Sequence, residues 1–120
     1  MPKVFVPHQA LRYDEDLHRR IPVRDISRAS QFGELVIVLE SSKSISVTNN
    51  VQSEIKERMA EFKDGDYIMA LGDPVVIAAC VMHASKVTSR VNMLKWNRDS
   101  KAYLHECLTA QNYPNSEHNI

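Results

Sequence analysis

The stretch Asp66-Tyr67-Ile68-Met69-Ala70-Leu71-Gly72-Asp73-Pro74 decides the fold of this 120-residue chain. Its apolar part, Tyr67–Leu71, is typical of a short buried strand. Gly72 permits a tight turn, Asp73 is a favoured helix N-cap, and Pro74 is favoured at the first helical position. The residues that follow, up to Lys86, are apolar almost all round. We therefore expect a strand that turns directly into a largely buried helix, packed between a sheet and an N-terminal arm.

Upstream of this stretch, a second strand and helix follow one another in the same order. Leu35–Leu39 is a run of five aliphatic residues, which is typical of a strand buried on both faces. The polar loop Ser41–Ser44 follows it. Apolar residues then recur every three or four positions and predict an amphipathic helix that ends before Asp64-Gly65: Val47, Val51, Ile55, Met59 and Phe62.

Downstream, Val91–Trp96 and Ala102–Leu108 are two strand candidates separated by the turn Asn97–Ser100. Strand, helix, strand, helix, strand predicts three parallel strands joined by right-handed crossovers, with an antiparallel C-terminal hairpin at the edge. The predicted fold class is thus α/β, a small single-domain βαβαββ sandwich. This reasoning leaves the order of the strands open.

The two ends of the chain have no clear periodicity. Lys3–Val6 reads as a short strand stopped by Pro7, and the charged residues from His8 to Gln31 read as an irregular arm with one helical turn near Asp25–Ala29. We therefore divide the chain into an N-terminal strand and arm (1–31), a compact α/β domain (32–108) and a flexible polar tail (109–120).

Composition narrows the classes of function. Hydrophobic residues make up 43% of the chain, enough for a core, and the formal net charge is zero, which excludes a strong overall attraction to nucleic acid or anionic membranes. The longest apolar stretch, Pro74–Met82, is too short to cross a bilayer, and the N-terminus lacks a signal-peptide core. We expect a cytosolic protein without membrane contact.

Three segments together resemble a family of small, largely uncharacterised bacteriophage proteins. These segments are the opening Lys3-Val4-Phe5-Val6-Pro7, the pattern Gly65-Asp66-Tyr67 followed by Gly72-Asp73-Pro74, and the hairpin Val91–Arg98, which is similar to an "LLKWDR" pattern with Asn97 in place of the usual Asp. The resemblance covers residues 1–106. It implies a viral source and action in the cytoplasm of the host, and it supplies neither an activity nor catalytic residues.

The carboxyl ends of the parallel strands are one candidate ligand site. Ser41, Ser42, Lys43 and Ser44 precede a helix N-terminus, and Asp73 follows the next strand; together they could hold a phosphate or nucleotide. The first loop lacks the glycines of a phosphate-binding loop, and Asp73 would repel an anion. A polar connector and a structural helix cap are therefore the favoured interpretation, and no cofactor is expected.

The cysteines and histidines are a second candidate. Cys80 and His83 share a helix face, and His105 and Cys107 share a strand face, so four zinc ligands or a Cys–His nucleophilic pair can be imagined. The apolar surroundings instead favour reduced core thiols, and we expect neither a metal site nor catalytic residues.

The C-terminal hairpin is the best surface candidate. Five cations and a single carboxylate lie between Lys86 and Lys101, and two aromatic residues flank the turn. The hairpin is either an ordinary edge with Trp96 in the core, a protein-partner surface, or a binding site for single-stranded nucleic acid. Its candidate residues are Arg90, Lys95, Trp96, Arg98, Lys101 and Tyr103.

The leading hypothesis is a non-enzymatic phage accessory protein that binds a host or viral macromolecule, and the favoured partner is a host or phage protein. The alternatives are a nucleotide or small-ligand domain at the strand ends and a nucleic-acid-binding hairpin. A homo-oligomer through the hairpin edge is also consistent with the pattern.

Overall fold

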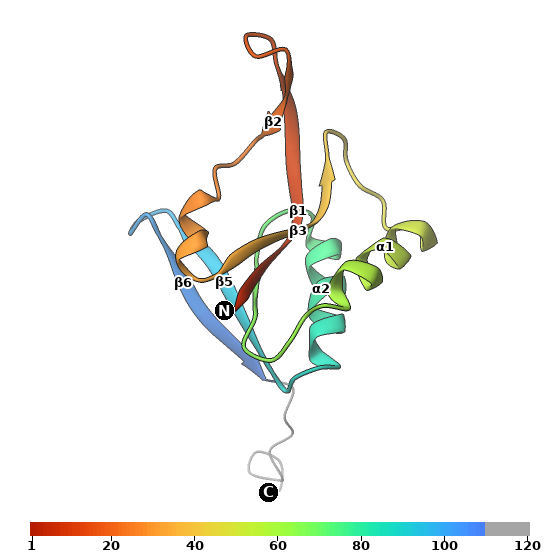
Figure 1. Cartoon of the computed structure of the whole chain (residues 1–120), viewed down its shortest axis with the longest axis vertical. Coiled ribbons are helices and arrows are strands. Elements are labelled where there is room, and N and C mark those ends of the chain that lie inside the picture. The colour runs from red at the N-terminus through yellow and green to blue at the C-terminus, as the bar shows by residue number, and fades with distance from the viewer. Residues whose placement is uncertain (110–120) are drawn as a thin grey trace, which may run out of the picture.

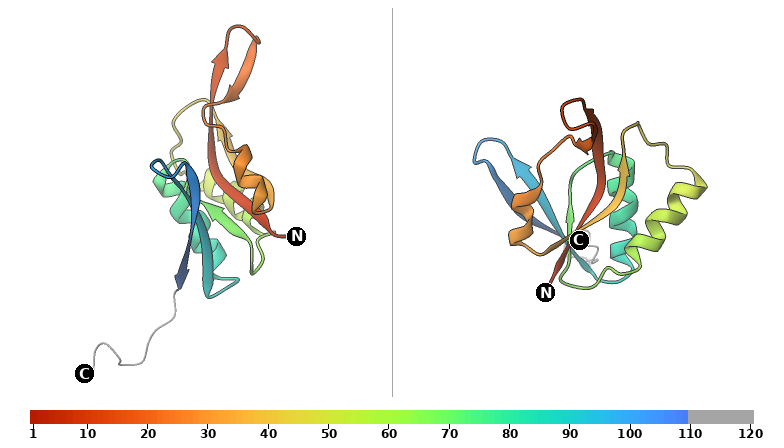
Figure 2. Two further views of the ribbon diagram at one scale, coloured as in Figure 1. Left: turned by 90° about the vertical axis from the view of Figure 1, so that its left-hand side faces the viewer. Right: turned by 45° about the horizontal axis from the view of Figure 1, so that its top comes forward.

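A mixed β-sheet runs through the centre of the protein, with two α-helices on one face and a 3-10 helix on the other (Figures 1 and 2). The computed structural model describes residues 1–109. Its elements, in chain order, are β1 (Lys3–Asp14), β2 (Arg19–Pro22), η1 (Ser27–Gln31), β3 (Glu34–Ser41), α1 (Asn49–Met59), β4 (Tyr67–Met69), α2 (Pro74–Ser85), β5 (Arg90–Asn97) and β6 (Ala102–Thr109). The tail predicted from residue 109 onward lies outside the described residues, apart from Thr109.

The predicted α/β class and the antiparallel C-terminal hairpin are confirmed. The parallel core is larger than expected, because β1 lies between β3 and β4 and is parallel to both. β4 is in turn parallel to β5, and β6 closes that side as an antiparallel neighbour of β5. The core therefore has four parallel strands instead of three, in the order β3-β1-β4-β5, followed by β6.

The N-terminal arm is the main error of the sequence-based prediction. β1 does not stop at Pro7 but continues to Asp14, where it forms a projecting hairpin with β2 (Figure 1). Proline lacks an N–H group and is normally excluded from central strands. Pro7 is tolerated because β4 pairs with β1 only at Val4 and Phe5, so the ladder on that side has ended before Pro7, while pairing with β3 continues beyond it.

The sheet buries apolar side chains on both faces. On the helix face, Phe5 packs with the residues that gave α1 its predicted periodicity, including Ile55, Met59 and Phe62. On the opposite face, Val4 and Val6 pack with residues of β4, β5 and η1. This alternation along β1 explains why a strand at the centre of the sheet contributes to two separate cores.

Helix α2 is not buried all round, contrary to the prediction. Val76, Cys80 and Ala84 face the core, whereas Val75 and Met82 are exposed. The N-terminal segment, which was expected to cover the helix, is instead a strand of the sheet and a connection on the opposite face. None of the described helices has the length and apolarity needed to span a membrane.

Two carboxylates of the Gly65–Pro74 segment accept hydrogen bonds from backbone N–H groups. The buried Asp66 carboxylate accepts hydrogen bonds from the Lys3 and Lys63 backbone N–H groups, both at 2.9 Å, and so ties β1 to the start of β4. The Asp73 carboxylate accepts from the N–H groups of Val75 and Val76 at the start of α2, at 2.8 and 3.4 Å. The predicted helix cap is thus confirmed.

Candidate functional site

The predicted ligand site at the strand ends is not assembled. β1 lies between β3 and β4, so the loops after these two strands start about 10 Å apart, or two strand spacings. The Ser41 hydroxyl is engaged within its own loop, where it accepts from the Lys43 N–H at 2.9 Å and donates to the Lys43 carbonyl at 2.6 Å. Ser42 and Ser44 are exposed, and Asp73 is used as the cap of α2.

The crevice between β1 and β4 is closed by Gly72 and His8. The connections after these two strands leave toward opposite faces of the sheet. Open α/β sheets usually bind ligands in the crevice between two such strands. Here the Gly72 backbone lies so close to His8 that an added Cβ would be 2.5 Å from the His8 Cβ and 2.6 Å from its carbonyl oxygen. The imidazole is buried, and its Nε2 has no hydrogen-bond partner among the described residues.

The six residues predicted on the hairpin are divided among different parts of it. Lys95 points to the helix side and forms an ion pair with Glu106 at 3.2 Å. Arg90 lies at the far end of β5, and Lys101 lies in the turn, where its carbonyl accepts from the Arg28 guanidinium at 3.5 Å. Only Trp96, Arg98 and Tyr103 come together in one surface hollow.

That hollow borders the link between β2 and η1, residues Val23–Ile26, which we call the strap. The strap crosses the face of the sheet opposite the helices, hereafter the strap face. Its first residue is tied to β1 by a hydrogen bond from the Val23 N–H to the Ala10 carbonyl at 2.8 Å. Its last residue, Ile26, is buried among side chains of β1, β4 and β5. The strap is thus anchored at both ends, and a hollow lies on each side of it.

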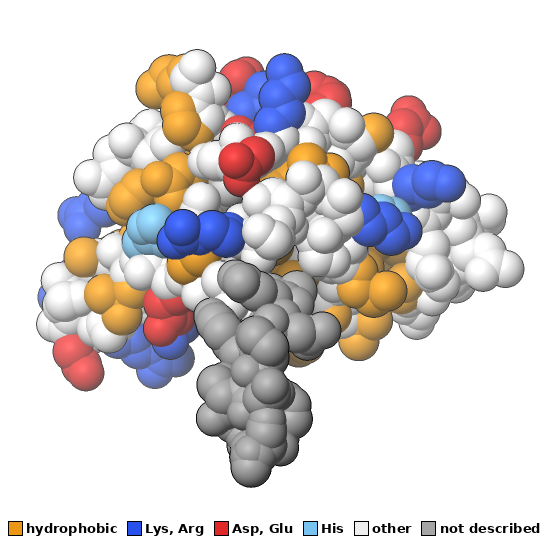
Figure 3. Space-filling model, turned by 90° about the horizontal axis from the view of Figure 1, so that it is seen from below, with side chains coloured by type: hydrophobic (Ala, Val, Ile, Leu, Met, Phe, Trp, Pro, Cys, Tyr) orange, Lys and Arg blue, Asp and Glu red, His pale blue; other side chains and the backbone are white. Residues whose placement is uncertain are grey.

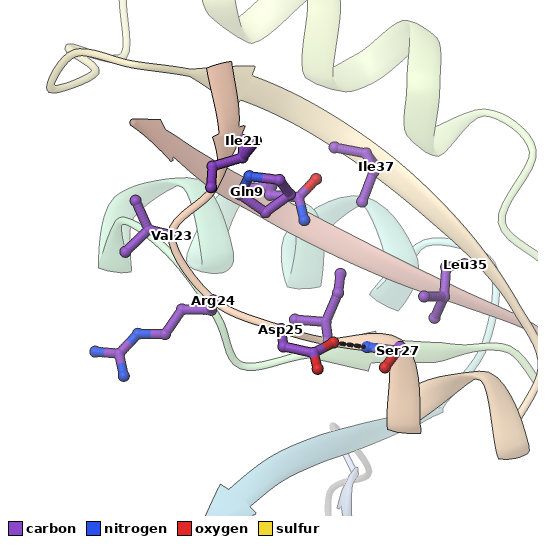
Figure 4. Close-up of a pocket in the computed structure, with 10 residues that line it drawn as sticks. Gln9, Ile21, Val23, Arg24, Asp25, Ser27, Leu35 and Ile37 are labelled. Atoms are coloured by element: carbon purple, nitrogen blue, oxygen red, sulfur yellow. Dashed lines mark hydrogen bonds between the residues drawn. The ribbon is translucent and has the colours of Figure 1, made fainter. Parts of the chain in front are cut away.

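The larger hollow has a volume of about 620 Å³ and lies between the strap, β1, β2 and β3. Most of its lining side chains are aliphatic: Ile21, Pro22, Val23, Ile26, Leu35 and Ile37. Figure 4 shows the Gln9 side chain pointing into it between Ile21 and Ile37, while Arg24 extends away. Gln9 is 7% exposed, and its amide makes no hydrogen bond with the described residues. The hollow therefore presents an unpaired donor and acceptor inside an apolar wall.

The smaller hollow, of about 440 Å³, lies on the other side of the strap. Trp96 is 42% exposed and packs edge-on against Tyr103, with ring centroids 5.1 Å apart. It therefore lies at the surface, contrary to the interpretation of the hairpin as an ordinary edge with Trp96 in the core. Arg24 and Arg98 bring positive charge to this hollow, and Asp25 brings negative charge. Desolvation, with a smaller effect of the Asp25 charge, raises the pKa of Tyr103. The Ser27 backbone N–H donates to Asp25 and lowers the pKa of that carboxyl.

The cysteines and histidines do not gather. Cys80 lies on the buried side of α2, in the core on the helix face, whereas His105 packs against Tyr67, a residue of the strap-face core. Within residues 1–109, no three His, Cys, Asp or Glu side chains are close enough to hold a metal ion. Burial raises the pKa of the Cys80 thiol to about 12. Cys107 was expected in the core but is exposed, because nothing in the described chain covers that part of β6.

The sequence did not predict the strap or the larger hollow, and of the smaller hollow it identified only the hairpin residues. The available signal was a set of apolar residues, Ile21, Val23 and Ile26, within an otherwise charged segment. Their spacing fits neither a helix nor a strand, because the chain changes from β2 to an irregular link at Val23.

Comparison with curated proteins and with solved structures finds no match to this chain. One family model does match, described as Phage Pam3 gp32-like protein, and the match extends over residues 2–109. It covers every described element, from β1 to β6. The predicted relation to a bacteriophage family is therefore confirmed, and the chain belongs to the Phage Pam3 gp32-like protein family.

Proposed function

We propose that this phage accessory protein acts without catalysis in the host cytoplasm, by binding a host or phage protein on its strap face. The observation that carries the proposal is the unpaired Gln9 amide in the larger hollow. The Gln9 amide makes no hydrogen bond within residues 1–109 and is open to solvent in the hollow, so a bound molecule can take the place of water as its hydrogen-bond partner. A peptide group offers one donor and one acceptor, the complement of what Gln9 offers.

The rest of the larger hollow fits the same kind of partner. Its aliphatic lining suits a hydrophobic side chain, and its volume lies within the range of typical ligand sites, about 300–1,000 Å³. A partner segment that placed one apolar side chain against Leu35 and Ile37 would bring its own backbone near the Gln9 amide.

The smaller hollow supplies the residue types that dominate the energetics of protein interfaces. Trp, Tyr and Arg are the residues most enriched at binding hot spots, and here Trp96, Tyr103 and Arg98 adjoin one another. Val23, on the strap between the two hollows, is 48% exposed. A partner that filled both hollows would bury it.

Nucleic acid is a weaker candidate for the same surface. Asp25 offsets part of the charge of Arg24 and Arg98, and Lys95 is engaged with Glu106 on the other side of the hairpin. The Trp96 and Tyr103 rings are inclined by 70° to each other and so do not form two parallel platforms for successive bases. At the end of the molecule seen in Figure 3, side chains of both signs are interspersed.

Affinity capture from lysate of phage-infected cells tests the proposal with two matched variants. Val23→Asp places a charge on the strap, whereas Val75→Asp places one on the exposed side of α2, where the wild-type valine is 58% exposed. We expect a protein that the wild type and Val75→Asp retain and Val23→Asp loses. Equal retention by all three, or no protein above background, would contradict the proposal. Salt-sensitive binding of single-stranded oligonucleotides, lost in Val23→Asp, would favour nucleic acid instead.

A further inference from the structure

Among residues 1–109, no segment covers the outer edge of β6 along its length. Its eight residues, Ala102–Thr109, pair one-to-one with β5 without a bulge, and they include no proline. β6 is the terminal strand on its side of the sheet, and within residues 1–109 no segment pairs with its outer edge (Figures 1 and 2). A long, regular edge of this kind presents a row of free backbone N–H and C=O groups to any strand of matching length.

The opposite edge of the sheet, β3, is partly covered by a side chain of α1. The Arg58 guanidinium reaches from α1 and donates a hydrogen bond to the Ile37 carbonyl at 3.2 Å, in the middle of β3. A long charged side chain across an edge is one of the ways in which proteins prevent strand addition. No side chain of the described residues reaches across β6 in this way. Its only carboxylate, Glu106, is instead engaged by Lys95 of the neighbouring strand at 3.2 Å.

The side chains of β6 are complementary to those of a second β6 in antiparallel orientation. With a two-fold axis at Glu106, Leu104 lies opposite Leu108 of the second copy, and Leu108 lies opposite the second Leu104. These leucines are 38% and 50% exposed in the single chain, and they share the face that carries Lys95. The same leucine–leucine contact therefore forms twice, as in an isologous interface.

We propose that β6 pairs with β6 of a second copy of this chain to form a symmetric dimer with one continuous sheet. Because the axis is perpendicular to the sheet, both strap faces point to the same side. This inference does not depend on the proposed function, because the edge of β6 and the hollows beside the strap are different surfaces.

In this register one contact, between the two Glu106 side chains, is unfavourable, and it allows a specific test of the proposal. The two Glu106 side chains face each other at the axis, and like charges directly opposite one another destabilise a strand pair. Lys95 of each copy offsets part of this repulsion. Removing the charge with Glu106→Gln should therefore strengthen the dimer, by about fivefold for two charges near 4 Å in water.

Sedimentation equilibrium of the full chain measures the association. The protein concentration should range from about 5 to about 200 µM, on the order of the dissociation constants expected of small interfaces. We expect concentration-dependent dimerisation, weakened about tenfold or more by Leu104→Lys and strengthened by Glu106→Gln. Leu17→Lys is the matched control, because Leu17 is a comparably exposed leucine in the β1–β2 turn, and Val23→Asp controls for the strap face. A monomer at every concentration, or equal loss in Leu104→Lys and Leu17→Lys, would overturn the proposal.

Cys107 provides an independent test that needs no substitution. In the proposed register the two Cys107 side chains lie on one face of the joined sheet. Their Cα atoms are separated by two residues along the strand and by one strand spacing across it, which gives a distance of about 8 Å. The other cysteine, Cys80, is buried. Bismaleimidoethane should therefore crosslink two chains through Cys107. If N-ethylmaleimide labels Cys107 fully while the bifunctional reagent yields no dimer, the second copy is the wrong occupant.

Discussion

Replacing Gly72 by alanine tests whether the crevice at the strand ends is closed by packing. Gly72 has φ +108°, a conformation that disfavours any side chain, and its Cβ would lie 2.5 Å from the His8 Cβ. The conformational cost is about 1–2 kcal/mol, and the overlap with His8 adds about 1–3 kcal/mol, as overpacked cores do. We expect Gly72→Ala to lower the free energy of unfolding by about 3 kcal/mol.

Gly65 is the matched control for this substitution. It has φ +96°, close to that of Gly72, but an added Cβ would meet no atom within 4 Å. Gly65→Ala should therefore show the conformational cost alone, about 1–2 kcal/mol. The difference between the two variants isolates the contact with His8.

Urea unfolding at 25 °C measures the free energy of unfolding of both variants. The transition is followed by far-ultraviolet circular dichroism and by the fluorescence of Trp96, the single tryptophan of the chain. With a urea dependence of about 1–3 kcal/mol per molar, the midpoints of the two variants should differ by about 1 M. Equal midpoints for Gly72→Ala and Gly65→Ala would refute the reasoning, because the strand-end crevice would then have room for a side chain, and a ligand site there would deserve renewed consideration.

Four further outcomes follow from the contacts described above. Gln9→Met should leave the free energy of unfolding within about 1 kcal/mol of that of the wild type, because the amide makes no hydrogen bond within residues 1–109. A captured partner should bind this variant about tenfold more weakly, and chemical denaturation and titration measure the two effects. Native protein at pH 8 should react with Ellman's reagent at Cys107 alone, and Cys80 should react only after unfolding, because burial raises its pKa to about 12; two fast thiols would contradict the packing of α2. Asp73→Ala should cost about 1 kcal/mol of stability in thermal or urea unfolding, since two N–H groups of α2 lose their acceptor, and no loss would contradict the cap. Desolvation, with smaller effects of Lys86 and Lys56, holds the pKa of His83 below its ordinary value of 6.5. On acidification through and below 6.5 the unfolded chain therefore takes up a proton that the folded chain resists, so stability should fall more in the wild type than in His83→Gln, and NMR titration should place the His83 pKa below 6.5.

The candidate site could be predicted only in part. Trp96, Arg98 and Tyr103 were identified as surface candidates from the aromatic and basic residues around one turn, and they do share a hollow. Gln9 and Val23 were not identified, because one lies in β1 and the other in the strap, and only the folded chain brings their hollows to one face of the sheet. Ser41–Ser44 and Asp73 were expected near one another, but the insertion of β1 between their strands separates them.

What the sequence determined by itself is local. The cap formed by Asp73, the turn at Gly72, the periodicity of α1 and the pairing of β5 with β6 each depend on residues close together in the chain, so composition and spacing were sufficient to predict them. These elements in turn imply the α/β class, because strands that alternate with helices form parallel sheets.

The tertiary structure alone decided which strand is central and which surfaces remain open. Pro7 reads as a strand terminator, and it is acceptable in β1 only because β4 stops pairing before it. The apolar residues of α2 are typical of a helix buried on all sides, and whether each is buried depends on which distant segment covers it. Side-chain type determines the tendency to be buried, but the covering partner is a long-range contact that local sequence does not encode. The hollows beside the strap therefore became visible only in the folded chain.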